Sequence, residues 1–244
     1  IIKQCCSGQI RAKTQVVLTF DDGYSDNYEV SFPILEKKGF PASFFLIADY
    51  VGSNTPLWDW QVINILNDYP SIKSIEIANK IIRQGPIEPR LPFIFRVLKE
   101  MKPISPAKRR QAISSLNVKT NTGFEFDRCV TWEEARKMSE AGMEIGSHSL
   151  SHRSLTRIPF FEAIEEIRKS KEVIEYNIKR PCCHFSFPFG GRQDYNQALI
   201  NCVKDSGYKS CLLNLHGYNY FKKDNFCFKR IIMAESTNVT HLFG

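Results

Sequence analysis

The stretch Val16-Val17-Leu18-Thr19-Phe20-Asp21-Asp22-Gly23 is a run of apolar and β-branched residues that stops at two carboxylates and a glycine. Such a run predicts a buried strand that ends in a turn. Residues 31–38 have a proline in the first turn and a glycine just after the end, which predicts a helix. Residues 42–47 predict a second buried strand. The segment therefore reads as a strand–helix–strand unit, in which the two strands are parallel.

The same alternation returns in the second half of the chain. Thr131-Trp132-Glu133-Glu134 predicts a helix that begins with a capping box, because Thr131 and Glu134 can each satisfy the other's backbone amide. The later elements that we predict are a strand at 143–146, a helix at about 160–178, a strand at 185–187, a helix at about 196–206, and last strands at 209–213 and 228–233. This order predicts an α/β fold, and 244 residues suit one barrel of alternating strands and helices.

The segment from about residue 56 to 127 departs from this alternation. Prolines at 70, 86, 89, 92, 103 and 106 divide it into short amphipathic pieces. We interpret it as a helical insertion on the barrel, which either forms one wall of a cleft or serves only in packing. We expect residues 12–244 to form a single domain and residues 1–11 to form an N-terminal extension.

The composition and charge of the chain bear on two classes of function, membrane spanning and nucleic-acid binding. The apolar fraction of 43% is ordinary for a globular protein, and no apolar run is long enough to span a membrane. The net charge of +7 is compatible with nucleic acid or anionic glycan, but a lysine-rich solvated surface explains it equally. The sequence has neither an RNA-binding aromatic pattern nor the spacing of a zinc finger, so we expect no nucleic-acid partner. The sequence indicates neither a protein partner nor a compartment.

Two groups of residues are candidates for metal binding and catalysis. His148 and His152 are four residues apart directly after a predicted strand, so one turn would bring both imidazoles to one face. Asp21 and Asp22 stand at the end of another strand, where barrel enzymes place catalytic groups. Either feature alone is explained as readily by chance or by a surface turn. Together, two imidazoles and one carboxylate suit Zn²⁺, with Co²⁺, Ni²⁺ or Fe²⁺ as alternatives, and leave one carboxylate to act as a base.

Three ordered motifs now resemble those of the polysaccharide deacetylases, the NodB-homology domain of carbohydrate esterase family 4. They are Thr19-Phe20-Asp21-Asp22-Gly23, His148-Ser149-Leu150-Ser151-His152 and Phe187-Pro188-Phe189-Gly190. Residues 39–45, 132–146 and 166–171 resemble the family as well. The resemblance implies an irregular (β/α)7 barrel with its site at the strand C-termini.

The resemblance also implies a role for each residue of the motifs. Asp21 would be the general base, and Asp22, His148 and His152 would bind the metal. Pro188, Phe189 and Gly190 would form one side of the substrate groove, with the Phe189 N–H holding the oxyanion.

Two features depart from the family pattern. The arginine that often precedes the proline motif is absent, and Arg230 from a late strand is our candidate to replace it. The late histidine that protonates the leaving amine is not evident either. His216 is the nearest candidate, and His184 and His241 are weaker ones.

We therefore expect a metal-dependent hydrolase that removes N-acetyl groups from an amino-sugar polysaccharide or glycoconjugate. The alternatives are a deformylase or O-acetyl esterase on the same scaffold, or a glycan-binding module with weak catalysis. The resemblance further implies a place of action at the cell envelope or outside the cytoplasm.

Overall fold

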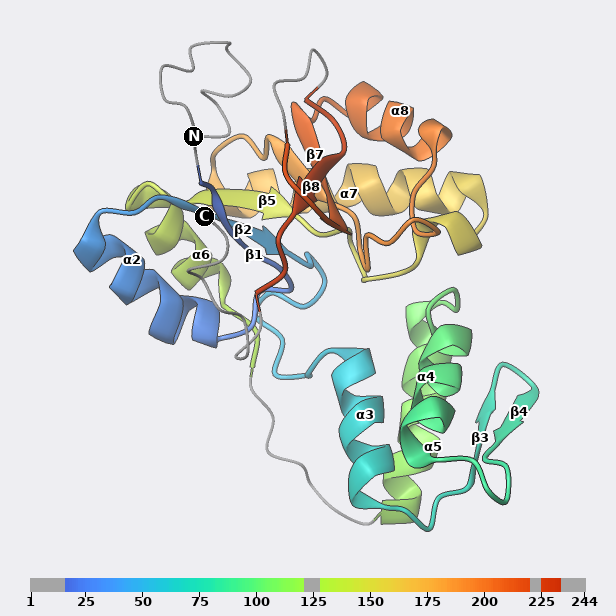
Figure 1. The fold of residues 1–244 in the computed structure, drawn as a ribbon. Coiled ribbons are helices and arrows are strands. Elements are labelled where there is room, and N and C mark those ends of the chain that lie inside the picture. The colour runs from blue at the N-terminus through green and yellow to red at the C-terminus, as the bar shows by residue number, and fades with distance from the viewer. Residues whose placement is uncertain (1–15, 121–127, 220–224, 234–244) are drawn as a thin grey trace.

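The computed structural model describes residues 16–120, 128–219 and 225–233 (Figure 1). The predicted extension at 1–11 and His241 lie outside the described residues. Within the described ranges, no helix is both long enough and apolar enough to cross a bilayer.

A six-stranded parallel sheet forms the centre of the fold, and it curls into a half-barrel (Figure 1). Its strands, in spatial order, are β1 (Leu18–Phe20), β2 (Ala42–Leu46), β5 (Glu144–Ser147), β6 (His184–Ser186), β7 (Ser210–His216) and β8 (Phe228–Arg230). Each strand pairs in parallel with the next. The predicted α/β barrel architecture is confirmed. The described residues contain six strands of this sheet, where the resemblance implied seven.

Four helices pack around the sheet: α2 (Phe32–Lys38), α6 (Trp132–Glu140), α7 (Phe160–Ile178) and α8 (Gln197–Asp205). Their predicted ends are confirmed. Gly39 ends α2 in the left-handed conformation with φ of 66°, and Thr131 with Glu134 forms the capping box of α6. Neighbouring helices contact one another, α6 with α7 and α7 with α8. A continuous apolar core, which includes Phe44, Phe185 and Ile167, lies between these helices and the sheet.

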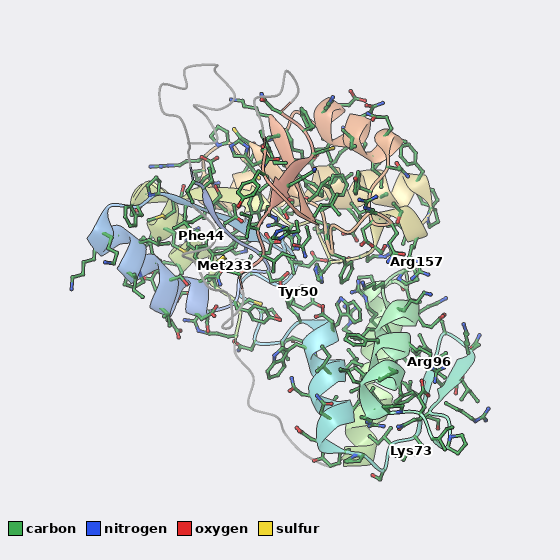
Figure 2. All side chains as sticks on the ribbon, in the orientation of Figure 1. Phe44, Tyr50, Lys73, Arg96, Arg157 and Met233 are labelled. Atoms are coloured by element: carbon green, nitrogen blue, oxygen red, sulfur yellow. The ribbon has the colours of Figure 1, made fainter. Side chains whose placement is uncertain are left out.

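The insertion forms a second group of elements beside the sheet (Figure 1). It consists of α3 (Trp58–Asp68), β3 (Ser74–Ile77), β4 (Lys80–Arg83), α4 (Arg90–Met101) and α5 (Pro106–Thr120). It has an apolar core of its own, and Phe189 from the third motif packs against that core. Figure 2 shows Tyr50 at the junction between the sheet and the insertion, and Arg157 facing the insertion.

The antiparallel hairpin β3–β4 is a feature that the sequence did not predict. Its turn consists of Ala78 and Asn79, which adopt left-handed φ values of 49° and 69°. Two-residue hairpin turns need this conformation, and the usual sequence signal for it is Asn-Gly or Asp-Gly. Alanine gives no such signal, so the segment read as part of a purely helical insertion.

Candidate active site

The shared direction of the parallel strands brings the chemical groups of several segments to one edge of the sheet. Asp21 and Asp22 follow β1, His148 follows β5, and Ser186 ends β6. Because parallel strands end on the same side, residues more than a hundred positions apart in the chain meet there. The structure thus brings together the residues of the three sequence motifs.

Asp22, His148 and His152 form a group that could hold a metal ion, with one ligand atom from each lying within 4.8 Å of the others. The Asp22 Oδ1 atom is 3.5 Å from His148 Nε2 and 3.6 Å from His152 Nε2. Zinc bonds of about 2.0–2.1 Å in a tetrahedron would place ligand atoms roughly 3.3–3.5 Å apart. Both distances from Asp22 Oδ1 are close to that spacing.

The hydrogen bonding of these side chains also fits a metal. His148 Nδ1 is 2.8 Å from the Ser186 carbonyl oxygen, which can only accept, so Nδ1 holds the proton and Nε2 offers a lone pair. The buried Asp22 Oδ1 has no hydrogen-bond partner among the described residues. A buried carboxylate oxygen without a partner is costly, and a bound cation would satisfy it.

Asp21 is held apart from this group by Arg230. The two guanidinium Nη atoms donate to Asp21 Oδ1 at 2.8 Å and to Oδ2 at 2.7 Å. Ser186 Oγ lies 3.3 Å from Asp21 Oδ2, and Arg230 also donates to Ser186 Oγ. Asp21 Oδ2 is 3.9 Å from His148 Nε2, which is farther than Asp22 Oδ1. The two neighbouring acids therefore occupy different environments.

The two acids also differ in pKa. Burial raises the pKa of Asp21, but the charge of His148 and the hydrogen bonds and charge of Arg230 outweigh burial and lower it overall. Burial, followed by the charges of Asp21 and Asp59, raises the pKa of Asp22 well above its ordinary value. Asp21 is thus stabilised as an anion by protein groups, whereas for Asp22 the charge of Arg230 is outweighed by burial and by the two neighbouring acids.

Burial lowers the pKa of both histidines and so favours their neutral forms. Burial lowers the pKa of His148, although the charge of Asp21 opposes it. Burial comes first, and electrostatic repulsion between the protonated ring and its neighbours His148, Arg109 and Lys102 adds to it, so the pKa of His152 is well below its ordinary value. Neutral imidazole is the form that binds a metal.

Four residues at the site other than glycine have left-handed backbone conformations. They are Asp22 (φ 73°), Ser149 (φ 68°), His152 (φ 55°) and Phe189 (φ 63°). This conformation costs energy for residues with a side chain, and such strain concentrates at functional sites. The surrounding structure must hold these residues in place.

The loop Ser149–His152 is held from two sides. On the barrel side, Glu166 of α7 accepts hydrogen bonds from the amides of Leu150 (3.1 Å) and Ser151 (2.8 Å). On the insertion side, Arg109 of α5 donates to the carbonyl oxygens of Ser151 (2.8 Å) and His152 (3.2 Å). The side chain of Arg109 is buried, although it is a cation.

Trp58, from α3, adds to the contacts on the insertion side. Its indole N–H donates to the His152 carbonyl at 3.3 Å, and the guanidinium of Arg109 lies 4.8 Å from its ring centre. The insertion therefore contacts the backbone of a candidate metal ligand directly.

Phe189 lies at the meeting point of the third motif, the histidine loop and the insertion. Its ring centre is 4.6 Å from that of His152 and 6.4 Å from that of Trp58. Gly190 follows in a left-handed conformation, and an added Cβ there would lie 2.4 Å from the Asn214 backbone nitrogen. Only glycine fits this close approach of the loop to β7.

The remaining histidine candidates differ in their surroundings. His216 stands opposite Arg230 in the pairing of β7 with β8, and its side chain is exposed. No contact links it to the acids or the two metal-site histidines within the described residues, so its proposed role stays a prediction. His184 is buried in β6 with Nδ1 2.7 Å from Ser210 Oγ, which indicates a structural role.

Asp59 is a site residue that the sequence reasoning missed. Its Oδ2 lies 3.7 Å from His152 Nδ1, and burial raises its pKa. It comes from the start of α3 in the insertion, next to Trp58. The dense Trp-Asp-Trp sequence at 58–60 was a signal for a functional surface, but nothing in the sequence indicates which part of the barrel it faces.

Comparison with known proteins agrees with this geometry. A family model described as polysaccharide deacetylase matches residues 9–211, which is most of the chain. The chain belongs to the polysaccharide deacetylase family. Residues 9–211 of the chain thus form a domain of the polysaccharide deacetylase type.

Individual members of the polysaccharide deacetylase family show different degrees of similarity. YxkH of Bacillus subtilis strain 168, provisionally named a polysaccharide deacetylase, is 39% identical over 59 residues; these are 24% of this chain and 21% of that protein. The structure of the Streptococcus pyogenes deacetylase PplD, solved with acetate, aligns with a TM-score of 0.60 at 15% identity, covering 99% of this chain and 74% of that one. A de-N-acetylase from Aggregatibacter actinomycetemcomitans aligns with a TM-score of 0.58 at 19% identity, covering 99% and 79%. These structural similarities concern the fold.

Proposed function

We propose that this polysaccharide deacetylase removes N-acetyl groups from amino sugars of a glycan and that it depends on a divalent metal ion, with zinc as the first choice. The observation that carries the proposal is the buried Asp22 Oδ1, which faces two imidazole Nε2 atoms and has no hydrogen-bond partner in the described chain.

Asp22, His148 and His152 would hold the metal. Two neutral imidazoles and one carboxylate form a set of borderline donors that suits Zn²⁺ and leaves positions open for substrate and water. When bound, such an ion acts as a Lewis acid toward the acetyl carbonyl group and lowers the pKa of a bound water. The Ser186 carbonyl fixes the His148 tautomer that this role requires.

Asp21 would act as the general base. It takes the proton of the attacking water as the oxygen adds to the acetyl carbon. Arg230 and Ser186 orient its carboxylate and keep it ionised, and they prevent it from becoming a fourth ligand. When the tetrahedral intermediate collapses, the C–N bond breaks and a protonated group donates a proton to the departing nitrogen, so acetate and a free amino sugar are the products.

The loop Pro188–Gly190 would line the groove and stabilise the tetrahedral oxyanion through the Phe189 N–H. Among the described residues, nothing accepts a hydrogen bond from that N–H, so it is available to a substrate. A backbone donor fixed by a strained loop is suited to this role, because it needs no reorganisation when negative charge develops.

Two variants at neighbouring positions test the proposal. Asp21→Asn should keep zinc and lose acetate release from N-acetylglucosamine oligomers, whereas Asp22→Asn should lose zinc as well. Zinc content by elemental analysis and acetate by an enzymatic assay are the two measurements. Full turnover by Asp21→Asn would remove the base assignment, and undiminished zinc in Asp22→Asn would remove the ligand assignment.

The same assay separates the alternative chemistries. Release of formate from N-formyl sugars in place of acetate would indicate a deformylase, and release of acetate only from O-acetylated sugars would indicate an esterase. Glycan binding with no release of either acid would indicate a binding module.

A further inference from the structure

The two ring nitrogens of His152 have different neighbours. Nε2 lies 3.6 Å from Asp22 Oδ1, on the side of the candidate metal position. Nδ1 lies 3.7 Å from Oδ2 of Asp59, which comes from the start of α3 in the insertion. Each nitrogen of this buried ring therefore has a carboxyl group beside it, one from the barrel and one from the insertion.

A neutral imidazole that binds a metal needs its two nitrogens in different states. The metal takes the lone pair of one nitrogen, so the proton must be on the other. For His148, the Ser186 carbonyl oxygen accepts from Nδ1 and fixes the proton there. His152 Nδ1 is buried and has no hydrogen-bond partner among the described residues. The tautomer of His152 thus depends on an acceptor that can reach Nδ1.

Asp59 is held in a position to be that acceptor. Its Oδ1 accepts a hydrogen bond from the Trp60 amide at 3.0 Å, and its Oδ2 is the oxygen beside His152 Nδ1. The separation of 3.7 Å exceeds the 2.7–3.2 Å of an N–H···O hydrogen bond, so a side-chain movement of roughly 0.5–1 Å closes it. A carboxyl oxygen can accept in both charge states of the acid, so this role does not depend on the charge of Asp59.

The other neighbours of His152 cannot accept the Nδ1 proton. Arg109 and Lys102 act on the ring as cations, and guanidinium and ammonium groups have no acceptor atom. The Phe189 ring contacts the imidazole with 4.6 Å between the ring centres, but it offers no lone pair. Asp59 is therefore the neighbour with the chemistry that Nδ1 requires.

We propose that Asp59 is a positioning residue, which accepts a hydrogen bond from His152 Nδ1 and so directs the Nε2 lone pair toward the metal. This inference rests on the proposed function and adds a side chain of the insertion to the support of the metal site. Trp58 and Arg109 hold the backbone of His152 from the same side. The insertion thus sets both the backbone and the ring orientation of one metal ligand.

Zinc affinity tests this role in a set of variants. Asp59→Leu removes the acceptor and should raise the dissociation constant of zinc by about 10- to 100-fold, the range for groups that orient metal ligands. Asp59→Asn keeps one carbonyl oxygen, so its loss of affinity should be smaller. Asp68→Leu is the matched control, because Asp68 is an exposed acid at the other end of α3, and it should bind zinc as wild type does. Competition with a chromophoric chelator measures the affinity, and circular dichroism establishes that each variant is folded.

The tautomer of His152 gives a second measurement, which a merely structural role of Asp59 would not change. The ¹⁵N chemical shifts of the neutral imidazole report which nitrogen holds the proton, and the absence of these signals from His152→Gln assigns them. In the metal-free protein, wild type and Asp68→Leu should have the proton on Nδ1. Asp59→Leu should have it at least partly on Nε2.

Neither measurement requires turnover, so this inference and the proposed function can fail separately. Absence of acetate release or of zinc binding by wild type would overturn the proposed function, yet a tautomer difference between wild type and Asp59→Leu would still support the orientation of His152 by Asp59. Wild-type zinc affinity in Asp59→Leu, an Nε2 proton in wild type, or one tautomer in both proteins would each overturn the positioning role. Asp59→Ala also lacks the acceptor, and it gives the same comparison if Asp59→Leu does not fold.

Discussion

Arg230 and Asp21 belong to segments at opposite edges of the sheet, yet they form a bidentate ion pair, with guanidinium Nη to carboxylate Oδ distances of 2.7 and 2.8 Å. Asp21 follows β1 and Arg230 ends β8, and these strands are the first and last of the sheet order. The sheet must curl far enough for its two edges to meet at this pair. The same contact therefore joins the two edges of the half-barrel at the candidate site and sets the orientation of the candidate base.

Replacing Arg230 should lower turnover without removing the metal. Arg230→Gln should reduce kcat by about a hundredfold, because misplacing a reacting group by about 1 Å has an effect of that size. Arg230→Lys keeps the charge but not the planar fork, so its loss should be intermediate. The measurements are kcat on an N-acetylated oligomer and zinc content, with Lys229→Gln on the exposed side of β8 as the control. Wild-type kcat in Arg230→Lys would show that the forked geometry is not needed.

Arg109 should affect metal affinity from a distance. Arg109→Met retains the bulk of the side chain but removes the donors to the carbonyl oxygens of Ser151 and His152. The strained His152 loop then keeps only its contacts with Glu166 and Trp58, and zinc affinity should fall by about 10- to 100-fold, the range for groups that orient metal ligands. Competition with a chromophoric chelator measures this affinity.

The neighbouring residue supplies the control for Arg109. Arg110 is exposed on the same helix, so Arg110→Met removes a positive charge without touching the loop. Equal zinc affinities in Arg109→Met and wild type would show that Glu166 and Trp58 suffice to hold the loop.

The sequence predicted those parts of the site that depend on local patterns. His148 and His152 are four residues apart in one loop, and Asp21 and Asp22 end a recognisable buried strand. Spacing and strand direction were therefore enough to predict that these four residues lie close together. Arg230 was a candidate only because an expected arginine was missing. Its partner is 209 positions away, and contacts of that range depend on how far the sheet curls.

The insertion was the least predictable part of the chain. Its helices follow from amphipathic patterns, but the placement of Asp59, Trp58 and Arg109 against the histidine loop depends on how one apolar core packs beside another. The hairpin at Ala78-Asn79 lacks the glycine that would have revealed its turn. Packing between separate cores leaves little trace in local sequence, so the insertion's contribution to the site emerged only from the structure.

Glu134 should make stability depend on acid pH. Its pKa is lowered from 4.5 to about 2, mainly by the hydrogen bonds from Arg128, with further help from Thr131. Between these two values the unfolded chain binds a proton that the folded protein does not bind, so stability falls as pH drops from about 4.5 toward 2. Glu134→Gln should remove this part of the pH dependence.

Urea unfolding at several pH values between 5 and about 2 measures the effect of Glu134. Glu133→Gln is the control, because Glu133 is an exposed residue of the same helical turn and surface ion pairs contribute little. A pH dependence in Glu134→Gln identical to that of wild type would show that the capping box is not coupled to stability in this way.

Asp22 should lower the stability of the metal-free protein and raise that of the zinc-bound protein. Without a cation, its carboxylate is buried near Asp21 and Asp59, and burial and these charges raise its pKa well above the ordinary value. Asp22→Asn should therefore raise the unfolding midpoint in the presence of EDTA, while zinc should raise the midpoint of wild type alone. At a zinc concentration of a hundred dissociation constants the gain is about 2.7 kcal/mol, or roughly 5–10 °C for a chain of this size. Thermal unfolding of both proteins with zinc and with EDTA gives all four midpoints. A variant that is less stable than wild type in EDTA would mean that Asp22 is satisfied by protein groups, and that the unpartnered oxygen is not kept for a metal.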